Sequence, residues 1–339
     1  MKNFILFTET HLKSILKPRL YETKFGEHIH LLSNITNINA QISKSDVKYV
    51  LIGINESIGI NANLGYSKAY NAFNACIKVL LNTQSNHFID PKTVLLLGSF
   101  EYPDFQKELK KLDLSTKKDL KKARQMVSMI DTDISKLVHD IVKAGKIPIV
   151  VGGGHNNAYG CIKGSSLALK NPINAVNFDA HTDFRPLEGR HSGNGFSYAM
   201  DEGFLKNYFI FGLHENYTSK AIFDSIEAQP TIAFNTFEDL RVRRRLKFKK
   251  ELKRAKQFIC NTPFGLEIDC DAIENINSSA KTPSGFSVEK TRQFISYFAK
   301  QKQVSYFHLC EASCSKKDET QVGKLLSFFI TDFIKAQND

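Results

Sequence analysis

The sequence predicts a single α/β domain of three layers, in which helices flank both faces of a doubly wound, mostly parallel β-sheet. Short apolar runs recur along the 339 residues, and helical patterns separate many of them. Strands that are apolar on both faces are typical of parallel sheets covered by helices. We expect one domain over residues 1–339, in which residues 1–45 form an N-terminal extension.

Eight apolar runs are the expected strands. Each is about six residues long, as is usual for a strand that is buried on both faces. The runs are YVLIGI (49–54), TVLLLG (93–98), IPIVVGG (147–153), INAVNF (173–178), YFIFGL (208–213), PTIAF (230–234), FGLEID (264–269) and VSYFHLCE (304–311).

Apolar residues at helical spacing predict the covering helices. We expect helices over residues 67–81, 123–145 and 322–337. The second pattern ends at Gly145, a typical C-terminal stop, and leads directly into a strand. Length alone would allow one large α/β domain or two smaller ones. Alternation of strand and helix along the whole chain favours one doubly wound domain.

The net charge of +11 comes mostly from two stretches, residues 107–124 and 241–256. Both interleave lysine and arginine with leucine at roughly helical spacing. Such a pattern fits a phosphate-binding face or the solvated side of a surface helix. No nucleic-acid-binding motif accompanies the charge, so we expect two surface helices and no nucleic-acid partner.

Several classes of protein are excluded by what the chain lacks. No apolar run approaches the ~20 residues that a membrane span needs. The opening MKNFILFTETHLKSILKPRL does not read as a signal peptide, and the six cysteines form no CxxC pair. These features predict a cytoplasmic protein with free thiols and no membrane partner.

Three polar clusters follow predicted strands, where sites form in sheets of this kind. They are GGGHNNAYG (152–160), NFDAHTDFRP (177–186) and GLEIDCDAIE (265–274). Alternate residues of an extended segment point to the same side, so their histidines and aspartates should converge. The candidate metal ligands are His155, Asp179, His181, Asp183, Asp269 and Asp271.

The composition of this ligand set indicates the metal. Buried carboxylates cost several kcal/mol each unless a cation compensates them. Carboxylates and imidazoles without sulfur suit Mn²⁺ better than a structural zinc. Six protein ligands are too many for one catalytic ion with open positions, whereas two ions about 3.5–4 Å apart can share them.

In combination and in this order, GGGHNNAYG, NFDAHTDFRP, HSGNGF and EIDCD resemble the ureohydrolases, the family of arginase, agmatinase and formimidoylglutamase. The resemblance spans most of the chain from about residue 50 and includes residues 61–73, with Tyr66 where the family usually has arginine. It implies an arginase-like fold, two Mn²⁺ ions held by the six residues above, and a small-molecule amidino or guanidino substrate. It also implies a homo-oligomer.

The resemblance further implies roles for individual residues. A hydroxide would attack the planar amidino carbon, oriented by a hydrogen bond to Asp183. Glu311 would pair with the cationic nitrogens of the substrate, while Ser192 and Asn194 would lie in the loop that reads its amino-acid end. Arg185 is a candidate for binding a substrate carboxylate or for a structural salt bridge.

Phe196 stands where arginases carry a proton-shuttling histidine. This departure resembles formimidoylglutamase and favours N-formimidoyl-L-glutamate as substrate, with glutamate and formamide as products, a step of histidine degradation. His191 or His214 could replace the shuttle, or could be ordinary loop histidines. The alternatives are an arginase or another guanidino hydrolase, and a scaffold of this fold that binds metal or a metabolite without turnover.

Overall fold

The structure, a computed structural model, describes residues 2–34 and 36–338. Within these residues nine strands form one sheet in the order β1-β3-β2-β4-β9-β8-β5-β6-β7. The strands are β1 (Phe4–Leu6), β2 (Tyr49–Asn55), β3 (Val94–Glu101), β4 (Ile147–Val151), β5 (Ile173–Phe178), β6 (Leu205–Leu213), β7 (Ile232–Thr236), β8 (Phe264–Asp269) and β9 (Val304–Cys310). All eight predicted strands are confirmed.

The strand that the sequence did not indicate is β1. It pairs antiparallel with β3 at the edge of the sheet, whereas the other strand pairs are parallel. Of its three residues only Phe4 is buried, so the strand lacks the continuous buried apolar run of an inner strand. Part of the expected N-terminal extension therefore belongs to the sheet.

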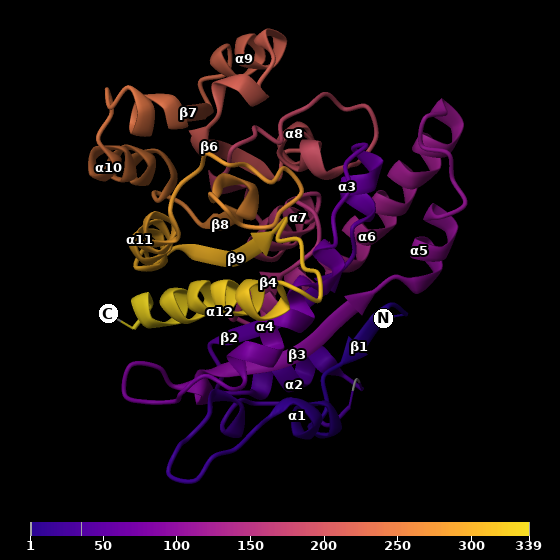
Figure 1. Cartoon of the computed structure of the whole chain (residues 1–339), viewed down its shortest axis with the longest axis vertical. Helices are drawn as coiled ribbons and strands as arrows, with labels where there is room; N and C mark the ends of the chain where they lie inside the picture. Colours follow the sequence, from indigo (N-terminus) through magenta and orange to yellow (C-terminus); the bar gives the residue numbers. More distant parts are fainter. Residues whose placement is uncertain (1, 35, 339) are drawn as a thin grey trace.

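Helices cover both faces of the sheet (Figure 1). They are α1 (Glu9–Ile15), α2 (Ile38–Lys44), α3 (Ile58–Ala62), α4 (Ala72–Leu80), α5 (Pro103–Leu109), α6 (Lys117–Lys143), α7 (Asn157–Leu169), α8 (Gly195–Asp201), α9 (Lys220–Glu227), α10 (Phe248–Ile259), α11 (Val288–Ala299) and α12 (Glu319–Ala336). Helices α4, α10, α11 and α12 share one apolar core, and α6, α7 and α8 share the other. Strand β4 shows the division: Ile149 and Val151 join the first core and Val150 the second.

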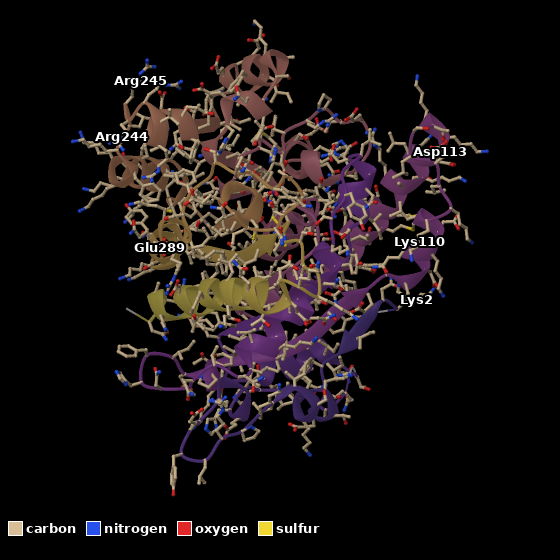
Figure 2. All side chains as sticks on the ribbon, viewed as in Figure 1. Lys2, Lys110, Asp113, Arg244, Arg245 and Glu289 are labelled. Atoms are coloured by element: carbon tan, nitrogen blue, oxygen red, sulfur yellow. The ribbon has the colours of Figure 1, made fainter. Side chains whose placement is uncertain are left out.

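The two basic stretches are exposed but are not continuous helices, which corrects the prediction. Residues 107–124 are divided by a turn between α5 and α6, where the Thr116 side chain caps α6 by accepting the Asp119 amide at 3.2 Å. In residues 241–256, a π-helical turn ends at Val242 and α10 begins only at Phe248. In Figure 2, Arg244 and Arg245 project from one corner of the molecule and Lys110 from another.

The predicted helices differ from the observed ones mainly at their beginnings. The predicted helix at 67–81 contains a short 3₁₀ turn (Ala69–Asn71) followed by α4, and the one at 123–145 begins six residues earlier as α6. Helix α12 confirms the closing helix and also begins earlier, at Glu319. Among the described residues, no helix combines the length and the apolar character that crossing a membrane would require.

Candidate metal centre and active site

The polar clusters meet at the carboxyl ends of four adjacent strands, β4, β9, β8 and β5. His155 follows β4, Glu311 follows β9, Asp269 ends β8, and Asp179 follows β5. The strands are parallel, so all four ends lie at one edge of the sheet. This is the crevice in which open α/β sheets bind their ligands.

A buried glutamate that the sequence did not single out shapes the loop that carries His155. Glu56 is fully buried after β2, and its Oε1 accepts the Gly154 amide at 3.0 Å and Asn157 Nδ2 at 3.0 Å. Gly153 has a φ of +75°, and a Cβ there would lie 2.2 Å from Asn157 Nδ2. The loop therefore requires glycine at this position for both its backbone conformation and its packing.

Three carboxylates surround one nitrogen of His155. The Nδ1 atom lies 2.7 Å from Asp183 Oδ2, 3.0 Å from Asp269 Oδ2 and 3.2 Å from Asp179 Oδ2. The ligand atoms of these four residues all lie within 4.8 Å of one another. The His155 side chain is fully buried. Such a concentration of negative charge around a buried imidazole nitrogen is the environment that a cation would stabilise.

Asp179 connects this group to the remaining two predicted ligands. Its Oδ2 faces His155, whereas its Oδ1 lies 3.6 Å from His181 Nδ1. The same nitrogen lies 3.8 Å from Asp271 Oδ2. A carboxylate whose two oxygens face two clusters can bridge two ions, so the arrangement can hold a pair of metals. All six predicted ligands are thus brought together, and their role as ligands stays a prediction.

The protonation behaviour of the cluster fits a cation. Burial, and then the charge of Asp179, raise the pKa of Asp269 well above its usual value. Burial and the same neighbouring charge also raise the pKa of Asp183. These carboxylates therefore repel one another in the absence of positive charge. A divalent ion would remove the repulsion and would use the His155 Nδ1 atom, which is buried without a hydrogen-bond partner.

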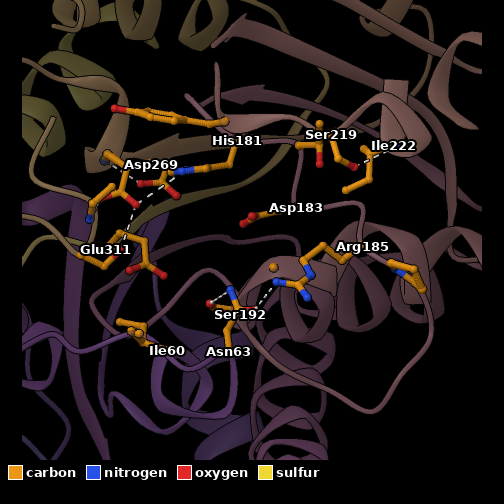
Figure 3. Close-up of a pocket in the computed structure, with 18 of the residues that line it drawn as sticks. Ile60, Asn63, His181, Asp183, Arg185, Ser192, Ser219, Ile222, Asp269 and Glu311 are labelled. Atoms are coloured by element: carbon orange, nitrogen blue, oxygen red, sulfur yellow. Dashed lines mark hydrogen bonds and ion pairs between the residues drawn. The ribbon is translucent and has the colours of Figure 1, made fainter. Parts of the chain in front are cut away.

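The cluster opens into a cavity of about 590 Å³ that Asp183, Asp269, Asp271 and Glu311 line together. Figure 3 shows Asp183, Asp269 and Glu311 around the same space. Glu311 Oε1 accepts the His155 amide at 2.8 Å, while its Oε2 is buried without a hydrogen-bond partner. Burial, and then the charge of Asp271, raise the pKa of Glu311 to about 8. The free oxygen is suited to an N–H group of a cationic ligand.

Two residues of the site adopt left-handed backbone conformations although neither is glycine. The φ angles are 43° for Asp183 and 61° for Glu311. Such conformations cost of order 1 kcal/mol or more and are often found at functional sites. The side-chain carboxylates of both residues line the cavity.

Arg185 lies across the cavity from Glu311, and Ser192 lies between them (Figure 3). The Arg185 guanidinium donates to Asn63 Oδ1 at 3.0 Å and to Glu188 Oε1 at 3.1 Å. Asn63 Nδ2 in turn donates to Ser192 Oγ at 3.3 Å. The Arg185 side chain is 46% exposed, so part of its hydrogen-bonding capacity is open to a ligand.

Asn194 does not line the cavity with Ser192. It is fully buried, and its Nδ2 donates to the carbonyl oxygens of Gly189 (2.9 Å) and Pro186 (3.3 Å). Its Oδ1 accepts from the His191 amide at 3.0 Å and from the Arg190 guanidinium. The side chain thus holds its own loop together, and its predicted contact with substrate stays a prediction.

Neither candidate for the proton shuttle lines the cavity. His191 is fully buried; its Nδ1 accepts the Gly193 amide at 3.1 Å and its Nε2 lies 3.1 Å from Glu188 Oε1. His214 is buried and stacks on Phe237, with ring centroids 4.5 Å apart. Their contacts favour the interpretation of ordinary loop histidines.

Phe196 is also enclosed within the core. Its ring stacks on Tyr208 with a centroid separation of 4.2 Å and meets His155 edge-on at 5.2 Å. Its side chain is fully buried and does not line the cavity. Phe196 therefore packs beside the metal-binding histidine candidate and offers no polar atom to a substrate.

Comparisons with known proteins agree with this geometry. A model described as the arginase family matches residues 94–328. The chain is 27% identical over 248 residues to the formimidoylglutamase of Streptococcus pyogenes serotype M3, covering 71% of this chain and 69% of that one. The fold is similar to formimidoylglutamase from Bacillus subtilis (TM-score 0.71, 17% identity, 95% and 94% of the two chains). It is also similar to Trypanosoma cruzi formiminoglutamase with Mn²⁺ (TM-score 0.73, 16% identity, 93% and 98%).

Proposed function

The chain belongs to the arginase family, and we propose that it is a manganese-dependent hydrolase that converts N-formimidoyl-L-glutamate into L-glutamate and formamide. The observation that carries the proposal is the convergence of four buried candidate ligands within 4.8 Å of one another. Two of them, Asp183 and Asp269, line a cavity that Glu311 and Arg185 also line. The names of the relatives from Streptococcus pyogenes and Bacillus subtilis support the substrate.

Two Mn²⁺ ions fit the donor set. His155, Asp183 and Asp269 would hold one ion, His181 and Asp271 would hold the other, and Asp179 faces both groups. The structure from Trypanosoma cruzi named with Mn²⁺ supports the choice of metal. Bound in this way, the ions would lower the pKa of water and polarise the amidino group.

The side chains of the site have separable tasks. Asp183 accepts a hydrogen bond from the attacking water and directs its oxygen toward the amidino carbon. Glu311 Oε2, which is buried without a partner, accepts an N–H of the cationic amidino group. Arg185, which is partly exposed across the cavity, binds a carboxylate of the substrate. The bond from the amidino carbon to the glutamate nitrogen then breaks, the water oxygen becomes the carbonyl of formamide, and the glutamate nitrogen takes up both protons of the water.

A substrate panel tests the proposal. Protein loaded with Mn²⁺ is incubated separately with N-formimidoyl-L-glutamate, L-arginine and agmatine, and formamide and urea are measured. We expect formamide from the first substrate and no urea from the other two. Urea as the main product would assign a guanidino hydrolase. Metal binding without product from any substrate would assign a scaffold that lacks turnover.

We also propose that the protein works in the cytoplasm as a homo-oligomer, and that residues 1–339 act as one domain. The six cysteines are free, which supports a reducing compartment. One sheet joins strands from β1 near the N-terminus to β9 near residue 310, which supports a single unit. Cell fractionation, light scattering and a single calorimetric unfolding transition are the corresponding measurements.

A further inference from the structure

A buried carboxylate outside the set of metal-binding candidates lies next to His155. Glu267 is fully buried within β8, where its neighbours in the strand are apolar. Its Oε1 accepts the Tyr306 hydroxyl at 2.6 Å, and its Oε2 lies 2.6 Å from His308 Nδ1. Tyr306 and His308 belong to the neighbouring strand β9, and His308 is the register partner of Glu267. The carboxylate is thus held in place from across the strand pair.

Glu267 faces the nitrogen of His155 that the aspartates do not reach. Its Oε2 lies 3.4 Å from His155 Nε2, whereas the aspartates surround Nδ1. Both histidine nitrogens are buried without a hydrogen-bond partner, and the contact to Glu267 is at ion-pair distance. The ring therefore lies between a cation-binding side at Nδ1 and one fixed carboxylate at Nε2.

The chemistry of imidazole makes this arrangement significant. A neutral imidazole carries one N–H, and a metal binds the nitrogen that lacks it. A carboxylate at the other nitrogen fixes the tautomer and the ring orientation and increases the basicity of the ligand. The proton must lie on Nε2 if Nδ1 is to bind an ion among the three aspartates.

Two other polar groups near the ring are the His308 imidazole and the Cys310 thiol. The ligand atoms of Cys310, His308 and His155 lie within 4.8 Å of one another. However, Cys310 Sγ donates to the Ile268 carbonyl at 3.6 Å, and a thiol is a weak acceptor. Glu267 is therefore the stronger acceptor for the Nε2 proton of His155.

We infer that Glu267 is a positioning residue, which holds His155 with its proton on Nε2 and thereby presents Nδ1 to the metal. The inference rests on the proposed function in one respect, because it requires that the site binds a metal ion. Burying the carboxylate is costly unless donors satisfy it, and Tyr306 and His308 supply them. Glu267, Tyr306 and His308 together support the metal ligand His155, and none of the three lines the cavity.

The experiment measures Mn²⁺ binding, with free Mn²⁺ counted by electron paramagnetic resonance, in wild-type protein and in Glu267→Gln. We expect the variant to bind Mn²⁺ ~10- to 100-fold more weakly, the usual effect of removing such a partner. Tyr306→Phe is the matched control, because it removes a bond to the same carboxylate but leaves Oε2 beside His155. It should retain wild-type affinity.

Folding is measured in parallel by urea unfolding of the metal-free proteins. If Glu267→Gln is too unstable, the triple variant Glu267→Met, Tyr306→Phe and His308→Leu replaces the network by apolar side chains, which cores tolerate better than a broken network. It should also bind Mn²⁺ more weakly. Unchanged affinity in the Glu267 variants, or an equal loss in Tyr306→Phe, would overturn the inference. Wild-type protein that binds Mn²⁺ but releases no formamide would instead contradict the proposed substrate.

Discussion

Glu311 and His155, on loops that follow neighbouring strands, are joined by a hydrogen bond of 2.8 Å from the His155 amide to Glu311 Oε1. The bond fixes one oxygen of the carboxylate and leaves the other buried in the cavity without a partner. The backbone of a candidate metal ligand thus orients the group that we propose for recognition of the substrate's charge.

Replacing Glu311 by glutamine should reduce kcat/KM for N-formimidoyl-L-glutamate by ~10- to 100-fold, because a hydrogen bond to a charged group is worth ~1.5–3 kcal/mol. Glutamine keeps an oxygen that can accept the His155 amide, so the Mn²⁺ content should not change. Steady-state kinetics and metal analysis provide the two measurements. Activity close to that of the wild type would remove Glu311 from the proposed mechanism.

Asp183→Asn and Asp269→Asn should each abolish activity and lower the Mn²⁺ content after dialysis. Both carboxylates lie within 3.0 Å of His155 Nδ1, and asparagine removes the charge that a cation would neutralise. Metal analysis by mass spectrometry and circular dichroism separate a lost ion from a lost fold. An Asp269→Asn protein that keeps both ions and turns over would show that the site assignment is wrong.

Phe196→His should leave the Mn²⁺ content unchanged and should not create a proton shuttle, because the side chain does not line the cavity. It should instead destabilise the fold by ~1–3 kcal/mol, since it replaces a buried ring stacked on Tyr208 by a polar one. Thermal unfolding and metal analysis test both parts. A gain in activity would mean that residue 196 reaches the substrate.

Arg185→Ala should raise KM for N-formimidoyl-L-glutamate by ~10-fold and change kcat less. The reason is that the substitution removes one hydrogen bond to the charged carboxylate of the substrate, and the loss of such a bond weakens binding by about this factor. Arg185 already contacts Asn63 and Glu188, so a purely structural role would lower stability and leave KM alone. Arg254→Ala is the matched control, because Arg254 is paired with Glu251 away from the cavity. Equal effects of the two substitutions on KM would contradict carboxylate binding by Arg185.

The stability of the metal-free protein should fall in mildly acidic solution because of His191. Burial, and then the charge of Arg124, lower the pKa of His191 to about 4. The ordinary pKa of a histidine is ~6.5. At pH values between this pKa and the lowered one, the unfolded chain binds a proton at His191 that the folded chain does not, so the free energy of unfolding decreases as the pH falls. His191 lowers the free energy of unfolding by at most ~1.4 kcal/mol per pH unit in this range.

His191→Asn removes this titration and retains an oxygen that can accept the Gly193 amide. Urea unfolding in the presence of a chelator at pH 7 and pH 4.5 should show a smaller loss of stability for the variant than for the wild type. The same loss in both proteins would show that His191 does not titrate in this way.

The sequence was sufficient to predict the inner strands and the cluster of candidate ligands, because both are encoded locally. Strands such as β5 are apolar on both faces, and Asp179 and Asp183 follow that strand within a few residues. The break before α6 was not predicted, because it depends on a few short side chains: Asp113 accepts hydrogen bonds from Ser115, and Thr116 caps the helix.

Residues whose roles depend on distant partners could not be predicted in the same way. Glu56 accepts hydrogen bonds from residues about a hundred positions away in the chain, and Glu267 meets His308 only after β8 and β9 have paired. A charged residue in the middle of the apolar run FGLEID was the one local signal for Glu267. Asn194 shows the opposite case, since its motif was recognised but its amide is used within its own loop.

The position of β9 has a consequence for the making of the protein. This strand lies between β4 and β8 in the sheet, although it comes after all the other strands that the structure describes. Until the ribosome has released residues 304–310, the earlier strands form two separate groups, with His155 on one and the aspartates on the other. The nascent chain can therefore acquire its pair of ions only after β9 has been made, and chaperones would meet two incomplete halves before that point.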